Sequence, residues 1–112
     1  MTKEIIYKDF EAVNIRVGTI IEAIENHELN KPSIILKIDF GPLGIKKSSA
    51  QLQSNYSSQN LINKQVAAVM NFPKKQIGNI VSEVLVVGFP DENNQPILIS
   101  PDKKVQNGGK LY

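Results

Sequence analysis

The residues best suited to chemistry in this sequence are lysines gathered near its middle. Residues 40–82 hold five lysines and no acidic residue, whereas residues 1–39 carry seven acids against five bases and residues 83–112 carry four against three. Positive charge segregated in this way favours contact with an anionic partner. The alternative is that the fold scatters these lysines over several faces. The pattern predicts binding rather than catalysis, with four candidate contacts: Lys46, Lys47, Lys74 and Lys75.

Polar and aromatic side chains accompany the lysines. Four of them can hydrogen-bond a sugar, a phosphate or a peptide backbone: Ser49, Gln51, Asn71 and Ser82. The alternative for the serines is bonding to nearby backbone, and for Asn71 a local turn. Phe72, beside the basic loop, is suited to stack on a base or to anchor an unfolded chain. It can equally be a core residue that ends its strand.

Catalytic arrangements are missing from the sequence. The single histidine, His27, lies in a polar segment, and the chain contains no cysteine. Disulfides and thiolate zinc sites are thereby excluded. We find no Ser-His-Asp arrangement, no close carboxylate pair and no glycine-rich phosphate loop. The sequence therefore predicts a protein that is not an enzyme, with no catalytic residue, no cofactor and no metal.

Length and hydropathy set the broad class. The 112 residues predict one domain, 1–112, long enough to bury roughly 60–70% of its unfolded surface. Apolar runs stay well below the roughly 18 residues of a membrane span, and the N-terminus lacks the apolar segment of a signal peptide. We expect a cytoplasmic protein without membrane insertion.

Short valine- and isoleucine-rich runs predict five main strands, over residues 14–25, 33–40, 45–49, 65–71 and 82–89, with a short added strand at 97–99. The last two main strands read as buried on both faces, joined by a basic loop. Pro73 cannot donate to a ladder, so the fourth strand must end before it. Gly18 is where we expect the long first strand to bend.

The connecting segments complete an all-β pattern. A short helix is predicted over 7–12, a polar loop over 25–33, and turns at 41–44 and 90–96. A helical turn capped by Ser57 or Ser58 should cover Leu61 and Ile62 and plug one end of a barrel. Together these elements predict a five-stranded OB-fold barrel with short helices. Another small barrel or sandwich is the alternative, because turn spacing does not fix topology.

An ordered set of segments, 40–41, 44–52, 61–66, 71–77 and 82–86, resembles one family. The set is similar to the CsaA-type secretion chaperones, a branch of the tRNA-binding OB-domain family that also includes free-standing tRNA-binding proteins and domains appended to aminoacyl-tRNA synthetases. The likeness runs from residue 9 to residue 108. In tRNA-binding relatives the basic loop is followed by Ser-x-Gly-Met, where this chain has Ser82, Glu83 and Val84.

This resemblance implies an OB barrel that forms a homodimer through its N-terminal helix and its segment 97–111. It also implies two kinds of partner, which are structured tRNA and unfolded preproteins or peptides bound for export. Glu83 would place a negative charge near the basic loop. The expected function is that of a CsaA-like chaperone holding unfolded preproteins, with structure-specific tRNA binding as the alternative.

Overall fold

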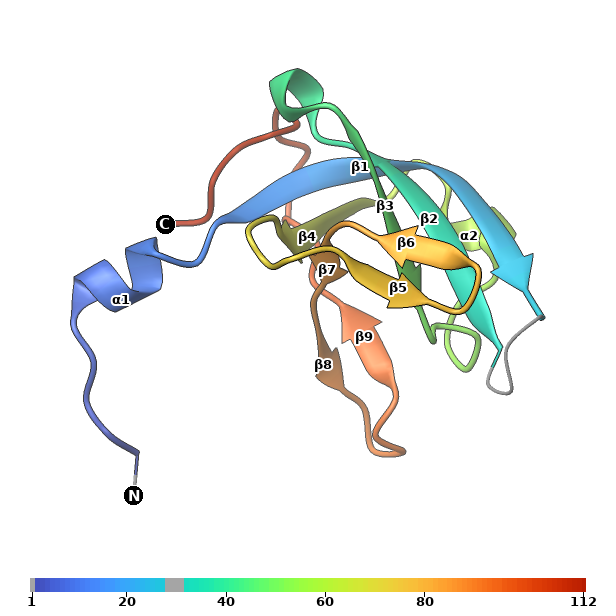
Figure 1. The fold of residues 1–112 in the computed structure, drawn as a ribbon, viewed down its shortest axis with the longest axis horizontal. Helices are drawn as coiled ribbons and strands as arrows, with labels where there is room; N and C mark the ends of the chain where they lie inside the picture. The colour runs from blue at the N-terminus through green and yellow to red at the C-terminus, as the bar shows by residue number, and fades with distance from the viewer. Residues whose placement is uncertain (1, 28–31) are drawn as a thin grey trace.

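The computed structural model describes residues 2–27 and 32–112, and most of its elements are strands (Figure 1). The helical elements are α1 (Tyr7–Glu11), α2 (Ser58–Leu61) and the short 3-10 helix η1 (Gly41–Leu43). The strands are β1 (Ile15–Asn26), β2 (Ser33–Asp39), β3 (Ile45–Ala50), β4 (Gln65–Val69), β5 (Lys75–Ile77), β6 (Ile80–Ser82), β7 (Leu85–Val86), β8 (Gly88–Pro90) and β9 (Pro96–Leu98). Residues 28–31 of the predicted polar loop lie outside the described residues.

Five strands form one antiparallel sheet in the order β3-β2-β1-β4-β7. The two edges of this sheet come together, because the amide of Glu83, just before β7, donates to the carbonyl of Lys47 in β3 at 2.8 Å. Joining the edges curls the sheet into a barrel and leaves fewer unpaired backbone groups. The predicted OB-type barrel is confirmed.

Strand β1 is long because its two parts pair with different strands. Its first part pairs with β4 from Ile15 to Thr19, and its second part pairs with β2 from Thr19 to Asn26. The register shifts between Ile20 and Glu22, so the bend predicted at Gly18 is wrong. Gly18 serves close packing instead: an added Cβ would lie 2.6 Å from Ile38 Cγ2 and 2.7 Å from Phe40 Cδ1.

The core lies inside the barrel and is closed at one end by α2. Alternate residues of β2 point inward, and Ile34, Leu36 and Ile38 are fully buried. Ser57 begins α2 as its N-cap and accepts a hydrogen bond from the Asn60 amide at 3.2 Å. The helix buries Leu61 in the core, as the predicted plug requires, although Ile62 stays partly exposed.

The segment after β4 differs most from the prediction. The basic loop is in fact a hairpin, because β5 pairs with β6 around the two residues Gly78 and Asn79. The predicted strand 82–89 is also wrong as a single buried strand. The chain changes partner at each step: β6 pairs with β5, β7 with β4, and β8 with β9. Only Val84 on this path is buried as a core residue, while Leu85 and Phe89 are more than half exposed.

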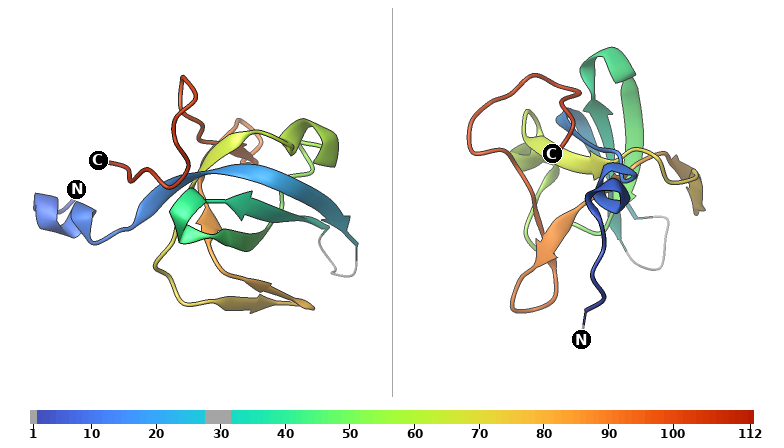
Figure 2. Two further views of the ribbon diagram at one scale, coloured as in Figure 1. Left: turned by 90° about the horizontal axis from the view of Figure 1, so that it is seen from above. Right: turned by 90° about the vertical axis from the view of Figure 1, so that its left-hand side faces the viewer.

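The C-terminal segment lies beside the first part of β1. The Gly108 amide donates to the Val17 carbonyl at 2.8 Å, and the Leu111 amide donates to the Ile15 carbonyl at 2.9 Å. The predicted N-terminal helix is confirmed as α1, which projects from the barrel at the same end as the C-terminus (Figure 2). No helix in the described part of the chain has the length and hydrophobicity needed to cross a membrane.

Candidate functional site

The line along which the barrel closes, here called the seam, joins residues 47–49 of β3 to residues 82–84. Two hydrogen bonds run between Lys47 and Glu83: the Glu83 amide donates to the Lys47 carbonyl at 2.8 Å, and the Lys47 amide donates to Glu83 Oε1 at 3.0 Å. Next along the seam, the Ser49 amide donates to Ser82 Oγ at 3.2 Å. Side-chain oxygens thus replace backbone carbonyls in part of the ladder.

A groove of about 320 Å³ lies beside this seam and is here called the seam groove. Its lining residues are Ser49, Phe72, Pro73, Lys75, Ile77, Ser82, Glu83, Val84 and Leu85. Phe72 is 55% exposed and Leu85 is 51% exposed. Phe72 is therefore not a core residue that ends its strand, and the groove offers apolar surface next to a lysine and two serines.

Four of the predicted site residues meet in this groove: Ser49, Phe72, Lys75 and Ser82. The two serines also bond within the protein, as the alternative for them proposed. Ser49 Oγ donates to Ser33 Oγ at 3.2 Å, and Ser82 Oγ donates to the Val84 carbonyl at 3.3 Å. Their hydroxyls fix the seam and still border the groove.

The predicted lysines do not share one surface. Residues directly opposite each other in an antiparallel pair project to the same face. Lys46 lies opposite the buried Ile38, whereas Lys47 lies opposite Lys37, so the two neighbouring lysines project to opposite faces of β3. Lys74 forms an ion pair with Glu83, Nζ to Oε2 at 3.6 Å. Strand alternation therefore separates the neighbours Lys46 and Lys47, and of the four predicted lysines Lys75 alone lines the seam groove.

Glu83 is the electrostatic centre of the seam. The hydrogen bond from the Lys47 amide, together with the positive charges of Lys74 and Lys46, lowers the pKa of the Glu83 carboxyl below its ordinary value of 4.5, against the opposing effect of burial. With 23% of its side chain exposed, the carboxylate stays ionised at neutral pH. The positive charge of Lys74, one of the predicted contacts, is thus partly neutralised by Glu83.

Asn71 and Gln51 lie outside the groove lining. The Asn71 amide nitrogen donates to the Ala12 carbonyl at 2.8 Å, and its oxygen accepts from the Asn14 amide at 3.0 Å. This side chain fastens the segment between α1 and β1 to the end of β4, rather than forming a local turn. Gln51 is exposed just after β3.

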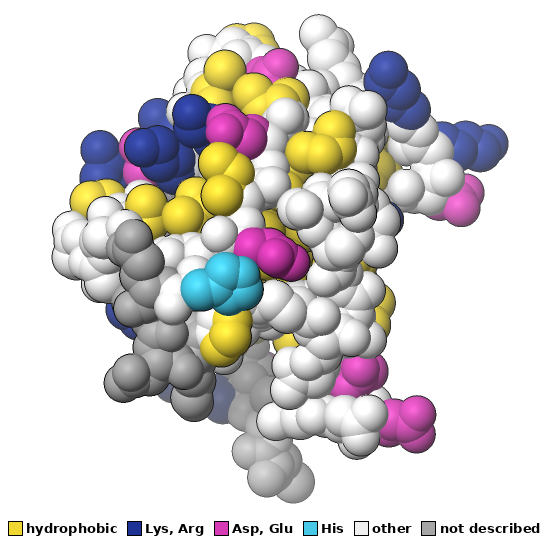
Figure 3. Space-filling model, turned by 90° about the vertical axis from the view of Figure 1, so that its right-hand side faces the viewer, with side chains coloured by type: hydrophobic (Ala, Val, Ile, Leu, Met, Phe, Trp, Pro, Cys, Tyr) yellow, Lys and Arg dark blue, Asp and Glu magenta, His cyan; other side chains and the backbone are white. Residues whose placement is uncertain are grey.

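The outer face of β2 and β3 carries charged side chains. Lys37 and Lys47 lie opposite each other, and Lys37 Nζ is 3.1 Å from Glu22 Oε2. Figure 3 shows cationic side chains gathered next to hydrophobic ones on the side toward which β1 runs.

His27, cyan in that view, has a side chain that is 70% exposed and lies 3.6 Å from Glu25, consistent with a solvated histidine. In residues 2–27 and 32–112, no three His, Asp or Glu side chains are grouped so as to hold a metal ion.

Five residues of the groove lining were not among the predicted site residues: Pro73, Ile77, Glu83, Val84 and Leu85. A signal for the hairpin that carries Ile77 was present. Gly78 and Asn79 stand between two isoleucines, and Gly78 has φ +59°, the conformation that two-residue hairpin turns need. No comparable local signal exists for Leu85, because its exposure follows from the change of strand partner around it.

Comparison with known proteins gives a consistent family. Residues 15–110 match the model of a family described as "putative tRNA binding domain". The crystal structure of chaperone CsaA from Bacillus anthracis is 40% identical, with a TM-score of 0.92 over 98% of this chain and 100% of that one. CsaA from Picrophilus torridus is 45% identical, with a TM-score of 0.88 over 97% of this chain and 100% of that one.

Curated relatives include much longer enzymes. The methionine–tRNA ligase of Pyrococcus horikoshii is 31% identical over 105 residues, which are 94% of this chain but 14% of the ligase. That of Methanococcoides burtonii is 30% identical over 108 residues, 96% of this chain and 16% of the ligase. This chain therefore spans about a seventh of the length of these relatives.

Proposed function

This chain belongs to the family of putative tRNA-binding domains, and we propose that it is a non-catalytic chaperone whose seam groove holds unfolded preproteins. Residues 1–112 act as one OB domain in this proposal. The high similarity to two CsaA chaperones over nearly the whole chain supports it. The setting in which we expect this activity is the cytoplasm, where preproteins are made.

The observation that carries the proposal is the exposure of Phe72 and Leu85 beside Lys75. Unfolded chains present apolar side chains and unpaired backbone groups, so a holding site needs both apolar contacts and hydrogen-bonding edges. Within the described residues, β5 is paired with β6 alone. Its other edge can accept an extended peptide by strand addition while side chains enter the groove.

Suppression of aggregation tests this function directly. A chemically denatured client is diluted into buffer with and without this protein, and light scattering follows aggregation. We expect scattering to fall at stoichiometric amounts of protein. Scattering that is unchanged at a severalfold excess, with a protein that melts cooperatively, contradicts the proposal.

Structure-specific tRNA binding is the second candidate function, and the family membership favours it. Lys75 borders the seam groove and Lys46 lies close enough to Glu83 to affect its pKa, so positive charge is available along the seam. Each phosphate that a lysine neutralises releases counterions, and affinity then falls as salt rises. Fluorescence titration with tRNA at two salt concentrations tests this function. Weak binding without a salt dependence contradicts it.

We also propose that two copies associate through their chain ends. Ile5, Ile6 and Tyr7 are 69, 65 and 64% exposed on the projecting N-terminal segment. An apolar hollow of about 500 Å³ lies between the first part of β1 and the C-terminal segment, and Ile15, Ile99 and Leu111 are among its lining residues. Exposed apolar surface of this kind is typical of a protein interface. Sedimentation velocity tests the proposal, and a monomer at micromolar concentration contradicts it.

A further inference from the structure

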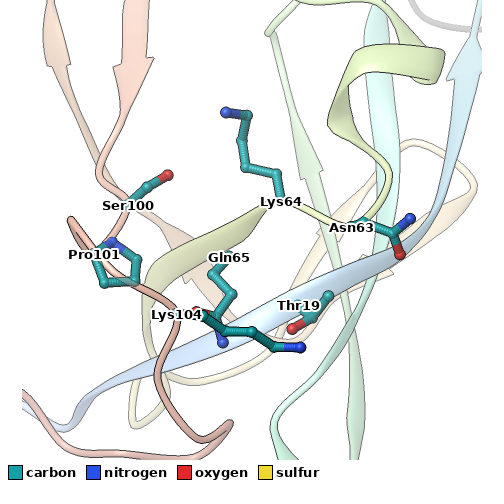
Figure 4. Close-up of a pocket in the computed structure, with 7 residues that line it drawn as sticks. All are labelled: Thr19, Asn63, Lys64, Gln65, Ser100, Pro101 and Lys104. Atoms are coloured by element: carbon teal, nitrogen blue, oxygen red, sulfur yellow. The ribbon is translucent and has the colours of Figure 1, made fainter.

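Another hollow, of about 440 Å³, shares no lining residue with the seam groove and is here called the basic hollow (Figure 4). Its lining residues are Thr19, Asn63, Lys64, Gln65, Ser100, Pro101 and Lys104. They come from β1, from the turn before β4 with the first residue of that strand, and from the C-terminal segment. Ser100 and Pro101 also line the apolar hollow assigned above to self-association, so the basic hollow borders that surface. The lining contains two lysines and four neutral polar residues, and no acidic residue.

The floor of the basic hollow is held by a closed hydrogen-bond network. Thr19 Oγ1 donates to Asn107 Oδ1 at 2.8 Å, and Gln65 Nε2 donates to the same oxygen at 3.0 Å. Gln65 also bonds the Val105 backbone twice, donating to its carbonyl at 2.7 Å and accepting from its amide at 3.0 Å. These bonds tie the C-terminal segment to β1 and β4, so the hollow exists before any ligand arrives.

The rim, in contrast, carries polar side chains that have no partner in the described part of the chain. Lys64 and Lys104 form no ion pair, and the side chains of Asn63 and Ser100 form no hydrogen bond, within residues 2–27 and 32–112. The backbone of Lys64 is fixed, since its amide donates to Leu61 and its carbonyl accepts from Ile20. Figure 4 shows Lys104 reaching toward Thr19, while the Lys64 side chain, at the edge of the hollow, points away from both residues.

The chemistry of this rim selects the ligand. Two ammonium groups without a carboxylate repel cations, and a polar lining gives no advantage to an apolar molecule. The volume falls within the range of about 300–1,000 Å³ that is usual for small-molecule sites. Lysine binds phosphate as a point charge, and a neighbouring hydroxyl and amide suit sugar hydroxyls or further phosphate oxygens. We propose that the basic hollow binds the phosphate monoester of a nucleotide.

This site is separate from the seam groove. The sheet order places β1 and β4 side by side, and the seam lies between β3 and the segment before β7, with β2 in between on one side. Two ligands could supply this phosphate monoester: a free nucleoside monophosphate and the 5′ end of an RNA. The proposal stands whether or not the seam groove holds preproteins.

Nuclear magnetic resonance titration tests the proposal. Adenosine 5′-monophosphate and inorganic phosphate are each added to the whole protein, with adenosine as the uncharged probe. We expect both phosphates, but not adenosine, to shift the amide signals of Asn63, Lys64 and Ser100. Equal shifts from adenosine, no shift at millimolar phosphate, or shifts confined to the seam groove overturn the proposal.

Adjacent lysines give a matched pair of variants. Lys104→Gln and Lys103→Gln change the charge equally, yet Lys104 lines the hollow and Lys103 does not. We expect Lys104→Gln, and likewise Lys64→Gln, to weaken nucleotide binding about tenfold, and Lys103→Gln to leave it nearly unchanged. Equal effects of Lys103→Gln and Lys104→Gln overturn the proposal and assign the lysines to a general charge effect. Loss of the dimer in sedimentation with Lys64→Gln also overturns it and assigns Lys64 to an interface.

A further comparison distinguishes the two sources. RNA oligonucleotides with a 5′-phosphate and with a 5′-hydroxyl are titrated by fluorescence anisotropy. A preference for the 5′-phosphate that Lys104→Gln removes assigns the site to an RNA end. Binding of the mononucleotide without such a preference assigns it to a free nucleotide. Either result supports the site, and absence of both overturns it.

Discussion

Lys47 and Glu83, 36 positions apart in the sequence, exchange two hydrogen bonds in which Glu83 uses both its backbone and its side chain. The carboxylate accepts the Lys47 amide at 3.0 Å and lies 3.6 Å from Lys74 Nζ. One residue therefore closes the barrel and partly neutralises the basic hairpin. Substitutions of Glu83 and of its neighbours can separate these two roles.

Replacing Glu83 should weaken the barrel. A carboxylate that accepts a backbone amide contributes about 1.5–3 kcal/mol, so we expect Glu83→Ala to lower the free energy of unfolding by roughly that amount. Glu83→Gln keeps an acceptor oxygen and should lose less. Denaturant unfolding followed by circular dichroism measures both. An unchanged midpoint for Glu83→Ala contradicts the role given to the seam.

The same contact predicts a pH dependence. The folded-state pKa of Glu83 lies below its ordinary value of 4.5, so the ionised form favours the folded protein. This stabilisation is complete above about pH 5 and is lost as the pH falls through the lower, folded-state pKa. We therefore expect the stability difference between the natural protein and Glu83→Gln to be constant near neutrality and to shrink in acid. A difference that grows below pH 4 contradicts the assignment.

Neighbouring lysines of the hairpin should contribute unequally to tRNA binding. Lys74 is paired with Glu83, whereas Lys75 forms no ion pair in the described chain. Lys75→Gln should therefore weaken tRNA binding more than Lys74→Gln, and Glu83→Gln should strengthen it. We expect Glu83→Gln to steepen the salt dependence by up to about 0.9 in the slope of log affinity against log salt. Titrations at several salt concentrations measure this, and identical slopes for all variants contradict it.

Client holding should depend on Phe72. Because this ring is 55% exposed, Phe72→Ala should change the free energy of unfolding by less than about 1 kcal/mol. It should still raise light scattering in the aggregation assay by removing an apolar contact from the seam groove. Phe89 is 67% exposed on β8, outside that groove, and Phe89→Ala is the matched control. Equal loss of activity in both variants contradicts a specific role for the groove.

Packing at Gly18 predicts a large cost for one methyl group. In Gly18→Ala the new Cβ would meet Ile38 and Phe40 at 2.6–2.7 Å, far inside van der Waals contact. Overpacking of this kind costs about 1–3 kcal/mol of stability. At Gly109 an added Cβ finds no atom closer than 3.5 Å, so Gly109→Ala serves as the control. Similar denaturation midpoints for the two variants contradict the account of Gly18.

Asn71 should control the N-terminal segment. Its side chain bonds both Ala12 and Asn14, and Asn71→Ala removes the two contacts together. We expect faster hydrogen exchange over residues 12–14 and weaker self-association, with a small loss of stability of about 1 kcal/mol because these groups are exposed. Hydrogen exchange and sedimentation velocity measure the two effects. Unchanged exchange at the Asn14 amide contradicts the tether.

Local patterns in the sequence were sufficient for most elements. Alternation in residues 33–40 predicts β2 and its buried isoleucines, and a capping serine before Leu61 predicts the plug. The hairpin of β5 and β6 was also within reach, since Gly78 and Asn79 form a recognised turn signal. Gly18 was misread because a missing side chain indicates either a bend or a close approach. The positions of the Ile38 and Phe40 side chains in the folded protein distinguish these two causes.

The sequence by itself determined that this chain forms an all-β barrel of the tRNA-binding family and that its middle carries lysines without acids. The tertiary structure alone decided which of those lysines share a surface. Successive strand residues point to opposite faces, so Lys46 and Lys47 are separated by geometry, while Lys74 and Glu83 are brought together by the closing of the sheet. Such distant pairings depend on the register of strands, which local preferences do not specify.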